Sequence, residues 1–189
     1  TYVYKSNETE KCLHILEKKT QILTDNVKSE KENFRELVSY LQKDAGVIPN
    51  ELLDFWMSES IRTFSLTRIA ILDMDEKILF TSNKNTGFSS NIEKKIIQRA
   101  SQTPTIALCA NNNQLVLIGS GIVTINENDK AILVVERELF NDKYLTNISN
   151  TMDCALNILI DDIYSKSTMK FSKFIGSKTE DVLFPSSKD

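Results

Sequence analysis

The sequence is poor in histidine, cysteine, glycine and proline, and each scarcity narrows what the protein can be. Its 189 residues include one histidine, three cysteines, five glycines and three prolines. Cys12, Cys109 and Cys154 are far apart and form no C-x-x-C pair, which argues against a disulfide framework and predicts free thiols. A single structural bridge stays open as an alternative. The lone histidine, His14, argues against Ser–His and Cys–His catalytic pairs.

The chain also lacks a basic excess and long apolar runs. It carries 23 basic and 26 acidic residues, a net charge of −3. Nucleic-acid-binding domains usually show a surplus of lysine and arginine, so we expect no nucleic-acid partner. There is no run of 18 apolar residues that would predict a membrane-spanning helix. If these residues belong to a larger membrane protein, we expect its membrane spans to lie outside them.

Sequence motifs that hold phosphates, metals or nucleophiles are missing as well. Neither G-x-x-x-x-G-K-[ST] nor G-x-G-x-x-G occurs. Asp73, Asp75 and Glu76 lack the glycine and the terminal glutamate of a calcium loop, so they predict a plain hairpin turn. His14 stands alone on a polar segment and reads as a surface residue. We therefore expect no catalytic residues, no metal site and no cofactor.

The first strong pattern is a long helix near the N-terminus. Residues 8–44 contain no glycine or proline, and apolar side chains recur at alternating steps of three and four. This seam comprises Leu13, Leu16, Leu23, Val27, Phe34, Leu37 and Leu41, interrupted by Thr20 and Glu30. Gly46 and Pro49 should end the helix. We expect its C-terminal half to pack on the domain and its N-terminal half to project as a stalk.

The remainder of the chain alternates between strand and helix patterns. Helices are expected at 51–64, with Asn50 as N-cap, at 91–101 and at 141–152. Strands are expected at 67–72, 78–81, 106–110, 115–125, 131–136 and 155–160, with weak strand character at 169–174. The expected fold class is α+β, with a long N-terminal helix and one antiparallel sheet of five to six strands flanked by helices. The predicted divisions are a stalk helix at 1–48, a sensor domain at 49–162 and a C-terminal extension at 163–189.

Three stretches resemble a known family. They are IAILDMDEKILFTS at 69–82, LVLIGSGIVTINENDKAILVVERELF at 115–140 and FNDKYLTNISNTMDCALNILIDD at 140–162. Together with the order of elements over roughly 9–162, they resemble the extracytoplasmic PAS-like sensors of the Cache family, found on bacterial and archaeal receptors. The resemblance implies a PAS-like sheet and a ligand on its concave face, covered by the loop and helix after the hairpin, here 82–101.

Polar or small residues within the apolar strands are the candidate lining of that site. They are Cys109, Ser120, Glu136 and Arg137. A buried glutamate or arginine without a partner is costly, so inside a pocket it implies a ligand or an ion pair. The alternative is that Glu136 and Arg137 lie at the end of the strand in water.

The functional prediction is a sensor domain of a membrane receptor, extracytoplasmic and without catalysis of its own. We expect a small-molecule ligand or a periplasmic protein as partner, a homodimer through the N-terminal helix, and a parent that is a histidine kinase or a chemotaxis transducer. Two alternatives stay open. One is an interaction domain without a pocket that docks a periplasmic protein, and the other is a cytosolic PAS-like or GAF-like regulatory module.

Overall fold

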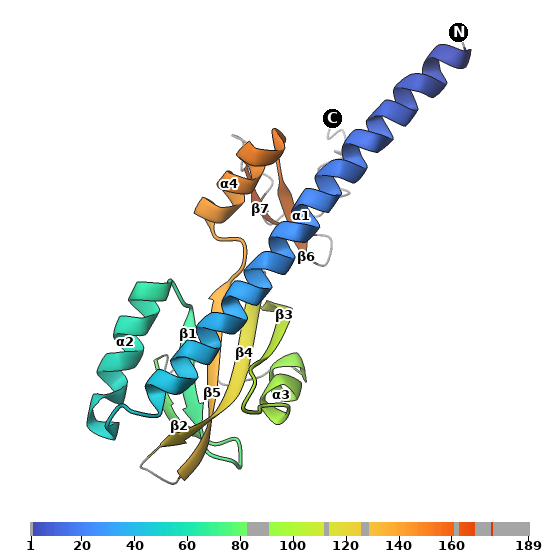
Figure 1. Ribbon diagram of the computed structural model, residues 1–189. Coiled ribbons are helices and arrows are strands. Elements are labelled where there is room, and N and C mark those ends of the chain that lie inside the picture. Colours follow the sequence, from blue (N-terminus) through green and yellow to red (C-terminus); the bar gives the residue numbers. More distant parts are fainter. Residues whose placement is uncertain are drawn as a thin grey trace, which may run out of the picture.

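The structure, a computed structural model, describes residues 2–82, 91–111, 114–125, 129–160, 163–168 and 175. The helices are α1 (Tyr2–Ala45), the 3-10 helix η1 (Asn50–Leu52), α2 (Leu53–Phe64), α3 (Asn91–Gln98) and α4 (Asp142–Met152). The strands are β1 (Arg68–Leu72), β2 (Ile78–Thr81), β3 (Thr105–Asn111), β4 (Gln114–Ile125), β5 (Asp129–Glu138), β6 (Asn157–Ile160) and β7 (Ile163–Ser167). Figure 1 shows α1 running across the sheet and on past it.

The C-terminal half of α1 packs on the sheet, as predicted. Phe34, Val38, Leu41 and Ala45 recur every three or four residues and are completely buried. Gly119 on β4 lets the helix approach closely, because a Cβ there would lie 2.6 Å from Val38 Cγ2. This half of α1 therefore belongs to the hydrophobic core, which explains why the seam is most apolar there.

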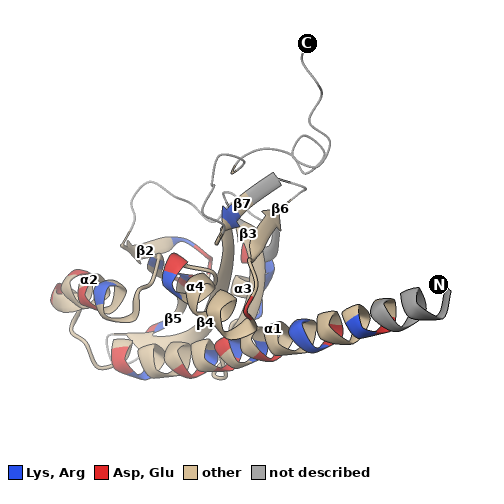
Figure 2. Ribbon diagram, turned by 90° about the horizontal axis from the view of Figure 1, so that it is seen from above, with Lys and Arg blue, Asp and Glu red and all other residues tan. Residues whose placement is uncertain are grey.

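The N-terminal half of α1 projects, but less of it is free than predicted. Leu13 and Leu16 are 54% and 63% exposed. Ile22, Leu23 and Val27, in contrast, pack against the main core. Acidic and basic residues are interspersed along the part of α1 that Figure 2 colours, as a solvent-facing surface requires. The exposed stalk thus ends near residue 21, because the small module described below covers the next two turns.

The main sheet has five antiparallel strands in the order β2-β1-β5-β4-β3. The apolar strand β5 is central, as its sequence suggested. Side chains of α1 and α2 pack on one face, with Ile69 and Leu133 among their partners. Ile96 and Ile97 of α3 cover the other face, against Ala70 and Val134. Because successive side chains of a strand point to opposite faces, each strand contributes to both layers. We call these two sides the α1 face and the α3 face.

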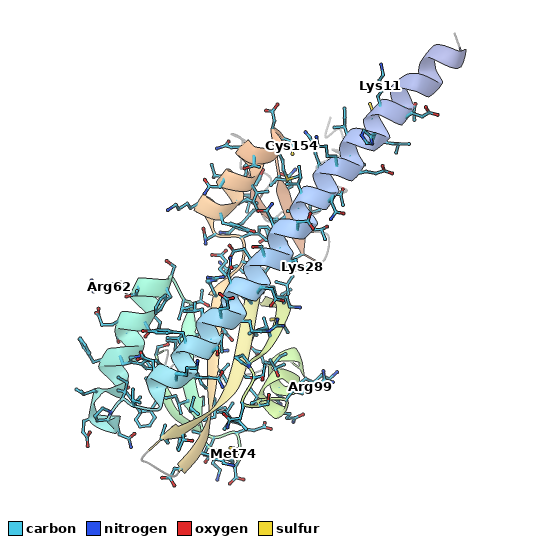
Figure 3. All side chains as sticks on the ribbon, viewed as in Figure 1. Lys11, Lys28, Arg62, Met74, Arg99 and Cys154 are labelled. Carbon is cyan, nitrogen blue, oxygen red and sulfur yellow. The ribbon has the colours of Figure 1, made fainter. Side chains whose placement is uncertain are left out.

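A small module, formed by α4, β6 and β7, follows the main sheet, and its strand pairing differs from the prediction. The predicted strand at 155–160 does form, as β6, but it pairs with β7 in a separate two-stranded sheet instead of joining the main one. Lys166 of β7 ties this module to the sheet through Glu138 of β5, at 2.7 Å. Figure 3 shows Cys154, which follows α4, beside the middle of α1 and far from Met74 in the β1–β2 turn.

The start of α2 also differs from the prediction. Asn50 does not cap the helix: it opens the short helix η1, and Leu52 occupies the N-cap position of α2 without a side-chain hydrogen bond. The inner face of α2 carries the buried residues Leu53, Trp56 and Met57. Trp56 Nε1 donates to Asp44 Oδ2 at 2.6 Å and so fastens α2 to the end of α1.

The predicted loop at 82–90, apart from Ser82, and the whole of the weak strand at 169–174 lie outside the described residues. The β1–β2 connection is the expected hairpin turn, in which Asp73 Oδ1 accepts from the backbone N–H groups of Asp75 and Lys77. In the part of the chain that the structure describes, no helix is long and apolar enough to span a bilayer.

Candidate functional site

Three charged side chains are buried together between the sheet and α3. Arg68 of β1, Glu93 of α3 and Glu136 of β5 are only 4%, 2% and 5% exposed. Arg68 donates from Nη2 to Glu93 Oε1 at 3.2 Å and forms a second ion pair with Glu136. Arg68 and Glu136 are direct neighbours in the β1–β5 register. We call this set the buried charge cluster.

The cluster places two carboxyl groups around one guanidinium. This arrangement affects the protonation of Glu136. Burial raises the pKa of Glu136 above its ordinary value, the ion pair with Arg68 opposes this, and the nearby carboxyl group of Glu93 raises the pKa further. Charged carboxyl groups are disfavoured in a region with little water to screen them. The arrangement therefore favours the protonated form of Glu136 more than water does.

Cys109 and Ser120, two of the predicted lining residues, lie on the same α3 face as Glu136. Ser120 is completely buried, and its Oγ donates to the backbone carbonyl of Ile96 at 2.6 Å, which holds the end of α3 against β4. Cys109 is 4% exposed and packs in the apolar cluster with Ile96 and Ile97. Three of the four candidates thus lie on the α3 face, and their role in binding stays a prediction.

The surroundings of Cys109 predict a protected thiol. Burial raises its pKa to about 11, and the charges of Glu93 and Glu136 add to this effect. Since the thiolate is the reactive form, iodoacetamide at pH 7.5 should modify the exposed Cys12 about 100-fold faster than Cys109. Peptide mass spectrometry over time measures both rates, and the difference should vanish in urea. Equal rates in the native protein would show that Cys109 is open to solvent.

Arg137, the fourth candidate, is on the opposite side of the sheet. Its guanidinium lies 5.0 Å from the ring centroid of Phe34, and its Nη2 donates to Glu30 Oε2 of α1 at 2.9 Å. It also lines a pocket between α1, the end of α2 and α4. Neither Glu136 nor Arg137 is simply an end-of-strand residue in water, which was the alternative interpretation.

Arg68 and Glu93 belong to the cluster but were not singled out from the sequence. Arg68 could have been identified from the sequence, because it is the only charged residue of the strand RIAIL, whose other residues are apolar. Glu93 gave no comparable signal, because a glutamate in the first turn of an amphipathic helix is ordinarily exposed. Among the described residues, no group of three or more metal-ligating side chains comes together.

Comparisons with known proteins bear on the fold. No protein-family model and no curated protein matches the sequence. The ligand-binding domain of the Campylobacter jejuni chemoreceptor Tlp3, in complex with 4-methylisoleucine, superposes with a TM-score of 0.50 at 14% identity, covering 72% of this chain and 61% of that one. The chain therefore spans less than two thirds of the length of that Tlp3 domain.

Two further structures align with lower scores. The ligand-binding domain of the Pseudomonas aeruginosa PAO1 chemoreceptor PctC in complex with GABA gives a TM-score of 0.48 at 6% identity, covering 86% of this chain and 79% of that one. The extracellular domain of rpHK1S-Z16, described as a histidine kinase, gives 0.49 at 16% identity, with 99% and 80% covered. The predicted resemblance is confirmed at the level of the fold: a long N-terminal helix followed by the PAS-like antiparallel sheet of ligand-binding sensor domains.

Proposed function

We propose that this chain is the extracytoplasmic sensor domain of a membrane receptor for signal transduction, and that it has no catalysis of its own. The observation that carries the proposal is the buried charge cluster on the α3 face of a sensor-type sheet. In this position Arg68, Glu93 and Glu136 offer both a cation and an anion to a ligand. Buried charges cost stability unless they are paired, so a cluster in which the pKa of Glu136 is raised suits a site where the proton of Glu136 is exchanged for a charged group of a ligand.

The ligand class that fits this cluster is a small molecule with an ammonium group, such as an amino acid or an amine. An ammonium group could pair with the carboxylate of Glu136, and a carboxylate on the same ligand could accept from Arg68. The complex of Tlp3 with 4-methylisoleucine shows such a ligand on the same kind of fold. The cluster is closed in this structure, so ligand entry requires α3 to move away from the sheet.

The proposal also covers the location of the chain and the receptor to which it belongs. We place the chain outside the cytoplasm, anchored to the membrane by segments beyond it, with a histidine kinase or a chemotaxis transducer as output. The exposed leucines of the stalk, Leu13 and Leu16, are compatible with a homodimer through α1. This dimer stays a prediction, as do the division at residue 162 and the periplasmic partner protein. β7 follows that predicted division and pairs with β6 before it.

A thermal-shift screen tests the ligand proposal. Purified protein is heated with amino acids, amines, carboxylic acids, sugars and nucleobases, and the melting temperature Tm is recorded. A ligand that binds only the folded state at 100 times its dissociation constant adds about 2.7 kcal/mol of stability. We expect an ammonium-bearing compound to raise Tm.

Two variants then test whether the compound that raises Tm binds at the buried charge cluster. Glu136→Gln should abolish the Tm rise, while Glu51→Gln, which changes an exposed glutamate on η1, should leave it unchanged. The proposal fails if no compound of the library stabilises the folded protein. It fails for the α3 face if Glu136→Gln binds the hit as tightly as the unmodified chain does.

A further inference from the structure

The pocket that Arg137 lines has a volume of about 300 Å³ and lies on the α1 face, where the main sheet meets the small module. Its walls come from α1, the end of α2, the end of β5 and the first turns of α4. We call it the joint pocket. Because Glu136 and Arg137 are neighbours on β5 that face opposite sides, the joint pocket is separate from the buried charge cluster.

Tyr144 of α4 gives the joint pocket an unused hydrogen-bond donor. Its ring packs on Phe140, with centroids 5.9 Å apart, and its hydroxyl oxygen is buried without a hydrogen-bond partner among the described residues. Burial raises the pKa of Tyr144 to about 12, with the charge of Glu30 adding to the effect. The phenol therefore keeps its proton at any physiological pH. That oxygen is closed to solvent, so an acceptor reaches it only when Tyr144 or the pocket wall shifts. A buried donor without an acceptor is costly, which favours such a shift once an acceptor binds.

Arg137 supplies a fixed cation in the wall of the same pocket. The ring of Phe34 and the bond to Glu30 hold its guanidinium in place. A guanidinium has five N–H groups, and the bond to Glu30 uses one of them, so a second acceptor can be bound without breaking the first. Lys143, which is exposed, adds positive charge at the pocket.

The remaining walls combine apolar side chains, paired acidic side chains and the neutral polar residues Ser65, Asn141 and Asn147. Phe64 and Leu139 offer an apolar surface for a short carbon chain. The two acidic residues of the wall do not leave a free negative charge: Glu30 pairs with Arg137 at 2.9 Å and Glu138 pairs with Lys166 at 2.7 Å. The positive charge in the pocket therefore comes from Arg137 and Lys143, and Tyr144 adds a neutral donor.

We propose that the joint pocket is a second binding site, and that it takes a small carboxylic acid with a short apolar chain. The carboxylate accepts hydrogen bonds from the Tyr144 hydroxyl and the Arg137 guanidinium, and the chain lies against Phe64 and Leu139. This goes beyond the proposed sensor site, which uses the opposite face of the sheet and the opposite charge on the ligand.

The test uses sodium butyrate as the probe, with butan-1-ol and butylamine as matched compounds and with ionic strength held constant by sodium chloride. Calorimetric titration and thermal shift are carried out on the unmodified chain, on Tyr144→Phe and on Tyr40→Phe, which changes an exposed tyrosine of α1. Tyr144→Phe keeps the ring and removes only the donor. Without butyrate its Tm should equal or exceed that of the unmodified chain, so a loss of binding cannot be ascribed to unfolding.

We expect butyrate, and neither the alcohol nor the amine, to bind the unmodified chain and Tyr40→Phe. Tyr144→Phe should weaken butyrate binding about tenfold or more, as expected for the loss of a hydrogen bond to a charged group. Glu136→Gln should leave the response to butyrate intact, which separates this site from the one on the α3 face. Absence of butyrate binding at millimolar concentration, equal binding by Tyr144→Phe, or equal binding of the alcohol would each overturn the proposal.

Discussion

Replacing Arg68 with methionine should destabilise the folded chain by about 3–5 kcal/mol, as expected when one partner of a buried ion pair is removed. Glu93 and Glu136 would then stay buried near each other without the cation between them. Urea denaturation at pH 7.5 measures the loss. Arg62→Met is the matched control, because Arg62 pairs with Glu59 at 2.6 Å but is 77% exposed, and such surface pairs contribute about 0–1 kcal/mol.

The pH dependence distinguishes this explanation from a simple loss of packing. The pKa of Glu136 is raised in the folded state, so the folded chain holds more protons than the unfolded chain between the ordinary value of 4.5 and the raised one. The contribution of Glu136 to stability is therefore complete below that window and is lost as the pH rises through it. Adding Glu136→Gln to Arg68→Met should recover stability at pH 7.5 and little at pH 4. An equal loss for Arg68→Met and Arg62→Met would contradict the role of the cluster.

Replacing Phe34 with alanine should cost about 3–5 kcal/mol of unfolding free energy. The side chain is completely buried between α1 and β4, and a Cβ at Gly119 would lie 3.3 Å from Phe34 Cε1. Its loss leaves a cavity under the helix and removes the aromatic face that supports Arg137. Thermal and urea unfolding, followed by circular dichroism, give the size of the effect.

The control for Phe34→Ala is Leu16→Ala on the same helix. Leu16 is 63% exposed on the stalk, so its replacement should change the stability of the monomer by no more than about 0.5 kcal/mol. Both changes introduce alanine into α1, so the difference between them isolates burial from helix propensity. A loss below about 1 kcal/mol for Phe34→Ala would mean that α1 is not an integral part of the core.

The long helix and the sheet could be predicted because their patterns are local. Phe34 and Leu41 mark the buried face of α1 through their spacing alone, and the turn at 73–77 follows from its run of polar residues. The separate sheet of β6 and β7 could not be predicted in this way. Strand propensity in ALNILI at 155–160 says that a strand forms, but its partner is decided by where α4 directs the chain.

The candidate site was predicted in part, for a similar reason. Cys109, Ser120 and Glu136 were found because small or polar residues interrupt apolar strands. The assignment of Glu136 and Arg137 to one pocket ignored the alternation of side chains, which places strand neighbours on opposite faces. Glu93 could not be singled out, since its burial depends on how α3 docks on the sheet and not on any feature of its own helix.

The length of α1 has a mechanical consequence. About 20 residues precede Ile22, where packing on the main core begins, and at 1.5 Å per residue they reach about 30 Å beyond the last support. A tilt of about 5° at that support would move the far end of this arm by about 2.6 Å, comparable with the helix shifts of 1–2 Å that switch other proteins. A tilt too small to disturb the packing of Phe34 would thus produce a larger displacement at the N-terminal end of α1. The helix would pivot where the main sheet meets the small module.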